Sequence, residues 1–295
     1  MRVTENLKIA PLTEANAESA SRLHMAARRA ASGERVSAPS DDPAAYAQIA
    51  RFQASAATYE ARRQAVDRAQ DSLAFAESAL ASAGDVMARA RELAVQMADG
   101  TLGPAERAVA AKEVTQLRQT LVGIANSRTA SGYVFGGTKT GAEPFSTSGL
   151  FSGNDEAIDV EIAEGSRIRA NTSGARAFTA AGGRDLFQDL QAFETALNAN
   201  DVAGIQGMIA AMDQGHAQIT GVRSEAGLGI DSLRMASSAA LVGKNAIEAS
   251  RARVQEVDAT EAYVELGSAQ QAFERSLEIT RKILSIMPGD KILAR

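Results

Sequence analysis

Few residues of this chain have the types and the spacing that catalysis or metal binding requires. Its 295 residues include no cysteine and two histidines, His24 and His216. Each histidine lies in a stretch with helical patterning and has no second metal ligand three or four positions later, so we interpret both as polar helix residues. No serine or aspartate stands in a nucleophile motif. The sequence therefore predicts no catalytic residues, no metal and no cofactor, and it favours a structural protein over an enzyme.

Two further patterns are similar to ligand sites, and we reject both. Asp41 and Asp42 are adjacent acidic residues just before Pro43, where aspartates far more often cap a helix and interact with its dipole than bind a metal. The stretch Gly137–Thr140 has a faint likeness to a phosphate-binding loop. It lacks the order G-x-x-x-x-G-K-[ST], and it follows a helix instead of joining a strand to one. We therefore expect neither a metal nor a nucleotide there.

The charge and hydropathy of the chain argue against two further classes of function. The net charge is −5 and the pI is near 5.3, whereas nucleic-acid binding needs a basic surface. No stretch comes near the roughly 20 apolar residues of a membrane-inserted helix. The N-terminus has neither the apolar run nor the cleavage site of a secretory signal. We expect a protein that stays inside the cell or leaves it by a route without a cleaved signal.

The strongest structural pattern predicts a long helix over residues 44–98, between Pro43 and Gly100. Apolar residues recur there at every seventh position in two sets. The first set is Phe52, Tyr59, Val66, Leu73, Leu80, Met87 and Ala94, and the second is Ala69, Ala76, Ala83, Ala90 and Met97. This pattern predicts a coiled-coil seam with a left-handed supercoil on a helix about 80 Å long.

The segments on either side of the long helix are also predicted to be helical. A weak seven-residue repeat over residues 12–32 predicts a helix that is stable only when packed against a partner. Residues 32–43, with Gly33 and two prolines, form a break. A helix over residues 104–130 makes an antiparallel hairpin with the long helix.

The second half of the chain begins with a change of pattern. Residues 132–183 combine glycines with short alternating apolar stretches, which predicts a small β-rich module inserted in the helical fold. Its short strands are expected around Tyr133–Phe135, Phe151, Ile158–Ile162 and Ile168. Helices follow over residues 184–199 and 202–287. The glycines of this helical region predict a kink or break near Gly227–Gly229, and its seven-residue series change phase around residues 257–264.

Four stretches of the sequence resemble the bacterial flagellin-like family. They are Arg91–Thr101; Ser32–Val36 followed by Pro39–Pro43; Gly132–Gly137 followed by Glu143–Phe145; and Val254–Ala259 with Ala269–Phe273. The third is similar to the branch of hook–filament junction proteins, the hook-associated proteins of the FlgL type. The resemblance covers both ends of the chain and leaves most of the β-rich segment unmatched. The tail Met287–Arg295 is more polar than the leucine-rich ending usual in the family.

The resemblance implies a mainly α fold, a long antiparallel helical rod or coiled coil in which the N- and C-terminal helices pair. It implies three parts: a terminal coiled-coil assembly domain of residues 1–43 and 255–295, a helical rod domain of residues 44–131 and 184–254, and a small outer β-rich module of residues 132–183.

The resemblance also implies a structural role in motility, outside the cell in the bacterial flagellum, after type III export without a cleaved signal peptide. There the protein would join the hook to the filament as a ring of about eleven subunits. Its partners would be further copies of itself, the first hook–filament junction protein, flagellin and a flagellar export chaperone. Terminal helices that fold only when neighbours bury their seams would couple folding to assembly.

The residues expected at the assembly interface form two groups. Those on the terminal helices are Leu12, Leu23, Leu266, Phe273, Leu277 and Leu284. Those on the long helix are Arg89, Arg91, Glu92 and Leu93. The simpler interpretation of the charged residues is a solvated face with Glu–Arg pairs, unless a neighbouring subunit covers it.

Two other functions stay open at this stage. A filament flagellin shares the fold and the export route, and Arg89 and Leu93 would then lie in the patch of flagellins that immune receptors recognise. The stretches Pro39–Pro43 and Tyr133–Phe145 argue against this alternative. The alternative from another class is a cytoplasmic coiled-coil scaffold, in which the two chain ends need not match each other.

Overall fold

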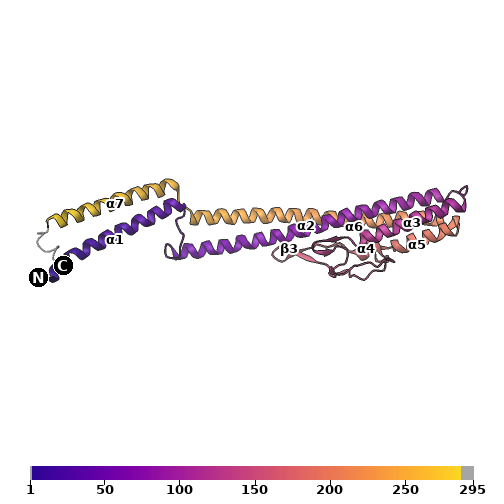
Figure 1. Ribbon diagram of the computed structural model, residues 1–295, viewed down its shortest axis with the longest axis horizontal. Coiled ribbons are helices and arrows are strands. Elements are labelled where there is room, and N and C mark those ends of the chain that lie inside the picture. Colours follow the sequence, from indigo (N-terminus) through magenta and orange to yellow (C-terminus); the bar gives the residue numbers. More distant parts are fainter. Residues whose placement is uncertain (1, 287–295) are drawn as a thin grey trace. The chain divides into compact units, whose positions relative to one another are not determined.

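The structure, a computed structural model, describes residues 2–286 and the side chains of residues 10–285 (Figure 1). The chain divides into two compact units. Unit 1 takes in the residues up to Ala57 and from Lys244 on, and unit 2 takes in Thr58–Gly243. Both boundaries fall within long helices, α2 (Pro43–Met97) and α6 (Val202–Gln255). Each of these two helices therefore contributes to both units.

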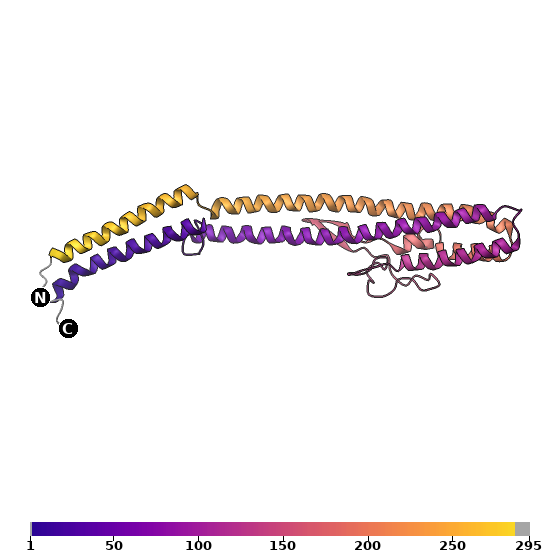
Figure 2. The same cartoon turned by 45° about the horizontal axis from the view of Figure 1, so that its top comes forward.

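Unit 1 is built on two antiparallel helices, α1 (Arg2–Ser32) and α7 (Ala259–Ile286), which lie side by side in Figures 1 and 2. Its alanine-rich sequence favours a helix in α1, and contact with α7 supplies the packing. The helix is longer than the predicted range of residues 12–32 and continues through Pro11. It ends as predicted at Gly33, whose φ of +71° suits glycine and whose N–H donates to the Arg29 carbonyl oxygen at 2.8 Å.

The connection between α1 and α2, residues 33–42, is held against the end of α6 within unit 1. The Arg35 N–H donates to the Gln255 carbonyl oxygen at 2.7 Å, and the Val257 N–H donates to the Gly33 carbonyl oxygen at 3.0 Å. A small apolar cluster contributes further contacts, formed by Val36, Ala45, Ile49 and Val254. The predicted break is thus an ordered connection.

The two adjacent aspartates of this connection accept hydrogen bonds from the backbone. The Asp42 carboxylate accepts from the Ala45 N–H at 3.0 Å, and the Asp41 carboxylate accepts from the Ser37 N–H at 3.1 Å. These bonds, foremost among the causes, lower the pKa of both carboxyl groups below the ordinary value of 3.8. Pro43 then opens α2, as predicted.

In unit 2, α2 runs antiparallel to α6 and buries the predicted seven-residue seam (Figure 2). The buried seam residues are Val66, Ala69, Leu73, Ala76, Leu80, Ala83, Met87, Ala90, Ala94 and Met97. Polar contacts align the pair, since Arg223 Nε lies 2.6 Å from Glu77 Oε1 and Ser237 Oγ donates to Asp67 at 2.7 Å. The seam prediction is confirmed for these positions.

The break predicted as one possibility at Gly227–Gly229 is absent, because α6 continues through this stretch. Some of its glycines allow close packing against α2. A Cβ atom on Gly215 would come within 2.8 Å of the Met87 side chain, and one on Gly229 within 3.0 Å of the Leu73 side chain. Each glycine lowers helix propensity by about 1 kcal/mol relative to alanine, and packing against α2 offsets that cost.

Helices α3 (Pro104–Ala125) and α5 (Leu186–Asn198) pack on each other and complete the helical part of unit 2. The α3 helix stops before the predicted end at residue 130 because Asn126 pairs with another segment. Its amide Nδ2 donates to the Phe145 carbonyl oxygen at 2.8 Å, and its Oδ1 accepts from the Phe145 N–H at 2.9 Å.

The predicted helical region over residues 202–287 is interrupted at residues 256–258, where the chain leaves α6 and starts α7. Asp258 caps the new helix by accepting from the Thr260 N–H at 2.7 Å. The break adjoins the predicted change of seam around residues 257–264. Residue 287, the last of the predicted helix, and the polar tail lie outside the described residues.

The inserted β-rich segment contains two small antiparallel sheets and much turn. The elements are β1 (Arg128–Thr129) with β2 (Gly132–Tyr133), β3 (Asp159–Ala163) with β4 (Ser166–Arg169), α4 (Gly174–Phe178) and the 3-10 helix η1 (Ala180–Gly182). The predicted strands around Val160 and Ile168 are confirmed. Beyond Tyr133 the predicted strand is wrong, because Phe135 is buried against aromatic rings.

A cluster of phenylalanines joins this segment to the helices. The rings of Phe135 and Phe178 meet edge to face at 5.1 Å, and those of Phe145 and Phe187 lie 5.4 Å apart. The β3–β4 hairpin packs separately on the α2·α6 pair, around the buried Leu233. The predicted fold class is confirmed: the protein is mainly α, with long α1·α7 and α2·α6 pairs and small inserted sheets. In the described part of the chain, no helix has the length and hydropathy of a membrane span.

Candidate assembly surfaces

Polar contacts at two levels align α1 with α7. Towards the end of α1, Arg29 Nη1 lies 2.9 Å from Glu265 Oε1, and both side chains are partly exposed. Further along, Asn16 Nδ2 donates to Thr280 Oγ1 at 2.9 Å. The Asn16–Thr280 contact lies in the half-buried part of the seam, and it shows which apolar residues of the two helices face each other.

The predicted interface residues of the terminal helices lie along this seam. Because both helices rise about 1.5 Å per residue, the contact between Asn16 and Thr280 puts Leu23 level with Phe273. These residues are half-buried within the chain: Leu12, Leu23, Leu266, Phe273 and Leu277. A seam between only two helices thus leaves apolar surface that further helices can cover.

Unit 1 also exposes a second group of apolar side chains on the same two helices. The exposed fractions are 40% for Met25, 64% for Tyr263, 68% for Val264, 55% for Ile279 and 42% for Leu284. Leu284, predicted as an interface residue, belongs to this group. Several large apolar side chains exposed on one helix pair are typical of an interaction surface.

The predicted charged residues of α2 form ion pairs within unit 2. Arg89 Nε lies 2.8 Å from Glu113 Oε1 on α3, and Arg89 Nη1 lies 3.0 Å from Glu92 Oε2. Arg91 pairs with Asp213 on α6. Hydrogen bonding to Glu113 is the main cause that raises the pKa of the Arg89 guanidinium. All these groups are exposed, so they contribute little to stability and remain accessible to a neighbour.

Leu93 differs from the other predicted interface residues of α2. It is 3% exposed and belongs to the apolar core of unit 2. Its side chain is covered by its own chain, so it offers no surface to another subunit. We therefore correct the candidate interface by removing Leu93 from it.

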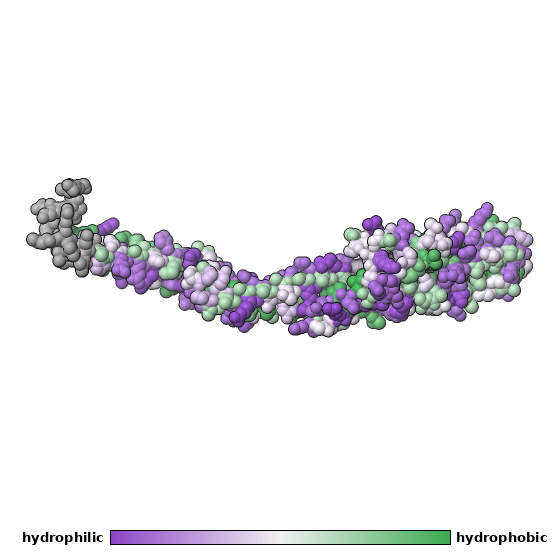
Figure 3. Space-filling view, turned by 90° about the horizontal axis from the view of Figure 1, so that it is seen from below, coloured by the Kyte–Doolittle hydropathy of each residue, from purple (hydrophilic) through white to green (hydrophobic). Residues whose placement is uncertain are grey.

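An exposed apolar stripe on α6 was not predicted. Leu228, Met235 and Val242 recur at every seventh position and are 70%, 67% and 67% exposed. Leu233 and Ala240, each five residues after a member of the stripe, are buried, about 140° away around the helix. On the face of the molecule drawn in Figure 3, apolar residues lie in small groups among polar ones. In the sequence, the stripe is visible as a second apolar series with a spacing of seven residues, beside the buried series of Leu233 and Ala240.

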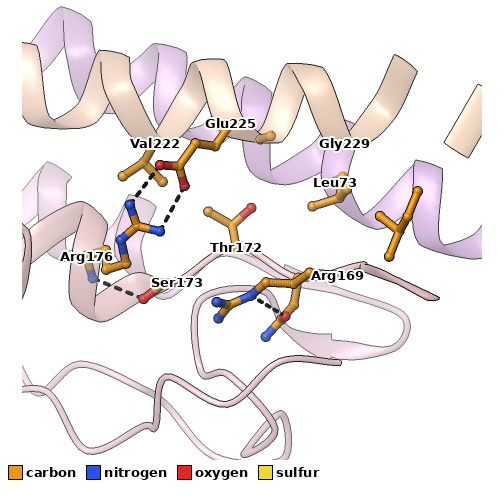
Figure 4. A pocket seen from close by; sticks show the side chains of 11 residues that line it. Leu73, Arg169, Thr172, Ser173, Arg176, Val222, Glu225 and Gly229 are labelled. Atoms are coloured by element: carbon orange, nitrogen blue, oxygen red, sulfur yellow. Dashed lines mark hydrogen bonds and ion pairs between the residues drawn. The ribbon is translucent and has the colours of Figure 1, made fainter. Parts of the chain in front are cut away.

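A cavity of about 250 Å³ lies in unit 2 between α2, α6 and the segment that leads into α4 (Figure 4). At its rim Arg176 makes two hydrogen bonds to Glu225, at 2.9 and 2.7 Å, which tie α4 to α6. Inside it, the Oγ1 of Thr172 has no hydrogen-bond partner among the described residues, although Thr172 is only 5% exposed. Glu225 neutralises the charge of Arg176 at the rim. This ion pair connects the inserted segment to α6 beside the cavity.

The two histidines are placed as expected for polar helix residues. His24 and His216 are both exposed, one on α1 and the other on α6. No cluster of three or more metal-ligating side chains occurs within the described range of the chain.

Comparison with known proteins agrees with this geometry. Residues 4–140 match the family model described as the bacterial flagellin N-terminal helical region. This match spans a little under half of the chain, and it agrees with the family resemblance drawn from the sequence. No curated protein matches the chain.

The chain is also similar to solved structures. FlgL of Bacillus cereus is 19% identical, with 67% of this chain and 96% of that chain covered and a TM-score of 0.58. FlgL of Xanthomonas campestris is 21% identical, with 70% and 98% covered and a TM-score of 0.58. The flagellar junction protein FlgL of Legionella pneumophila is 17% identical, with 70% and 99% covered and a TM-score of 0.56. These similarities establish a shared fold.

Proposed function

We propose that this chain is a structural protein of the flagellum that joins the hook to the filament, because residues 4–140 match the model of the bacterial flagellin N-terminal helical region. The observation that carries the proposal is this family match. A fold shared over nearly the full length of several FlgL chains supports it. The protein then lies outside the cell, at the hook–filament junction, after export without a cleaved signal.

The inserted segment favours a junction protein over a filament flagellin. The Tyr133–Phe145 stretch resembles the junction-protein branch, and in this chain its two phenylalanines belong to the ring cluster that joins the segment to the helices. Phe135 and Phe145 are both 0% exposed and both contact the Phe178 ring. Substitution of either phenylalanine would weaken the packing of the inserted segment on the helices. The stretch is therefore required for this fold of the segment.

Assembly proceeds through the terminal helices of unit 1. Their seam is half-buried in one chain, and Tyr263, Val264 and Ile279 are exposed beside it. Neighbouring copies cover these side chains when the subunits close into a ring, of about eleven members by family resemblance. Burial of this apolar surface on assembly adds to the stability of the pair that α1 and α7 form within each chain.

The partners follow from the position in the flagellum. One side of the ring contacts the first hook–filament junction protein, and the other contacts flagellin. Before export an export chaperone covers the terminal helices, whose exposed apolar residues would otherwise associate. Arg89, Arg91 and Glu92 remain accessible on α2 and contribute to contacts between copies.

A deletion strain tests the proposal. We expect cells that keep their hooks, do not swim and shed flagellin monomers into the medium, with all three properties restored by the wild-type gene. Loss of flagellin itself from the medium, with no filament protein left, would establish the flagellin alternative. Unchanged swimming would contradict a flagellar role and favour the cytoplasmic scaffold.

A further inference from the structure

The seam between α1 and α7 contains a polar cluster of three side chains. Asn16 Nδ2 donates to Thr280 Oγ1 at 2.9 Å, and Ser276 Oγ donates to Asn16 Oδ1. The Thr280 hydroxyl donates in turn to the Ser276 carbonyl oxygen at 2.9 Å. All three residues are half-buried. The two hydrogen bonds give both the nitrogen and the oxygen of the Asn16 amide a partner on α7.

The polar residues of the cluster interrupt apolar series on both helices. On α1 the series with a spacing of seven is Asn16, Leu23 and Ala30, and on α7 it is Leu266, Phe273 and Thr280. Asn16 and Thr280 are the polar members of these series, and the structure brings them into contact. The polar residue of each series therefore lies opposite the polar residue of the other along the helix pair.

A shift of α7 by seven residues shows what the cluster can select. Leu23 would then face Leu266 instead of Phe273. One apolar contact would replace another, so the free energy of this contact would change little. Asn16 would face Phe273, and its amide would lose both partners from α7. An unpaired amide in a half-buried seam disfavours an arrangement by about 10- to 100-fold. The two registers therefore differ little in the free energy of apolar burial. They differ mainly in whether the Asn16 amide has hydrogen-bond partners on α7.

We infer that the Asn16–Ser276–Thr280 cluster specifies the register in which α1 pairs with α7. A buried asparagine in a coiled-coil seam sets alignment in this way, and it lowers the stability of the pair. The inference rests on the proposed function in one respect, since register matters because neighbouring copies must meet identical surfaces. A shift of seven residues moves α7 by about 10 Å along α1, which would displace Tyr263 and Ile279 from the positions that a neighbour meets.

A competing determinant of register lies at the other end of the seam. The Val257 N–H donates to the Gly33 carbonyl oxygen at 3.0 Å, which ties the start of α7 to the end of α1. Asn16 lies 17 residues before Gly33, about 25 Å along the helix. If the loop contacts alone set the register, removal of the Asn16 amide changes the stability of the seam without changing its alignment.

The chain contains no cysteine, so pairs of introduced cysteines report the register cleanly in the full-length protein. One pair, Leu23→Cys with Phe273→Cys, joins residues that are level in the structure. The other, Leu23→Cys with Leu266→Cys, joins residues that become level after a shift of seven. Disulfide formation under mild oxidation is measured for both pairs, because a disulfide forms only when the two residues are close.

The expected result is a native-register disulfide in the otherwise wild-type chain, with little of the shifted one. In the Asn16→Leu background the ratio of shifted to native disulfide rises about tenfold or more. The matched control is Ser19→Leu, a half-buried residue one turn away, which adds apolar surface to the same seam and keeps the cluster. It leaves the ratio unchanged.

An unchanged ratio in the Asn16→Leu chain overturns the inference and assigns the register to the loop contacts. A wild-type chain that forms the shifted disulfide as readily as the native one, or that forms neither, also overturns it. The readout is independent of the flagellum, because it reports the pairing of two helices in one purified chain. Failure of the junction function in the deletion strain would leave these results standing.

Discussion

The buried side chain of Arg107, on α3, donates from Nε to the carbonyl oxygen of Met97 at the end of α2, at 3.1 Å. Its Nη2 donates to the Asp99 carbonyl oxygen at 2.8 Å, and its Nη1 donates to the side chain of Asn200. Arg107 is only 2% exposed. One guanidinium thus satisfies carbonyl groups at the end of α2 and also holds Asn200, whose φ is +54°, in the turn after α5.

The Arg107→Met substitution tests this role. It keeps most of the side-chain volume but removes the donor to the carbonyl oxygen of Met97, a buried residue, whereas the Asp99 carbonyl oxygen still accepts from the Leu102 N–H at 3.3 Å. We expect the free energy of unfolding to fall by about 3 kcal/mol, measured by urea denaturation. Arg107→Lys is the control, since it keeps the charge but cannot reach three acceptors at once, and it should give an intermediate loss. A Met variant as stable as the wild type would contradict the role.

The helical pairs could be predicted from the sequence, because their cause is local. Val66, Leu80 and Met87 recur at the spacing that puts them on one face of a helix, and the structure buries all three. A break at Gly227–Gly229 was wrongly predicted because helix propensity counts a glycine only as a loss. The gain from close packing against Leu73 depends on α2, which lies far away in the sequence.

The assembly surfaces were predicted only in part. Arg107 could not be identified from the sequence, since its acceptors are backbone carbonyls of a turn and nothing in their residue types marks them. Leu93 was assigned to an interface through the family resemblance, which does not show that its side chain is buried in this chain. The α6 stripe of Leu228, Met235 and Val242 was present in the sequence as a second series, but only the structure shows which series is buried.

Two neighbouring residues of α6 distinguish packing within the chain from contact between chains. Met235 is 67% exposed on the stripe, whereas Leu233 is fully buried against α2 and the β3–β4 hairpin. We expect Met235→Ser to change the free energy of unfolding by no more than about 0.5 kcal/mol and yet to reduce self-association, measured by sedimentation. Leu233→Ser is the matched control, with an expected loss of about 3 kcal/mol or more. Normal self-association of the Met235→Ser protein would remove the stripe from the assembly surface.

The aspartates at the starts of two helices predict a loss of order in acid. Backbone N–H donors lower the pKa of Asp42 and of Asp258 below the ordinary value of 3.8, Ala45 being the main cause for the first and Glu261 for the second. Because the folded pKa is below the unfolded value, folding favours the ionised form. The stabilisation is therefore fully present above about pH 4 and is lost as the pH falls through the lowered pKa values.

Amide chemical shifts at the start of α7, followed by NMR as the pH is lowered, measure this loss. We expect the Thr260 and Glu261 signals to be constant from neutral pH to about pH 4 and to move towards unfolded values below it. Asp258→Asn is the control, because asparagine also caps a helix but does not titrate. The same acid transition at Thr260 in the Asn variant would show that the carboxylate is not its cause.

The interface of the terminal helices is tested by two leucines of α7 in different environments. Leu277 is half-buried in the seam with α1, whereas Leu284 is 42% exposed. Replacing both by aspartate should give a soluble, helical monomer that no longer joins hook to filament, because charged groups in an apolar contact lose hydration without gaining a partner. Helicity is measured by circular dichroism and function by motility of a complemented deletion strain.

The single variants separate the two contributions. Leu277→Asp should weaken the pairing of α1 with α7 in the monomer as well as assembly, whereas Leu284→Asp should affect assembly alone. Glu278→Gln, at an exposed position between them, is the control and should leave both unchanged. Normal motility of the double aspartate variant would contradict an assembly role for α7, since two buried charges in every subunit of a ring cannot be tolerated without loss of contact.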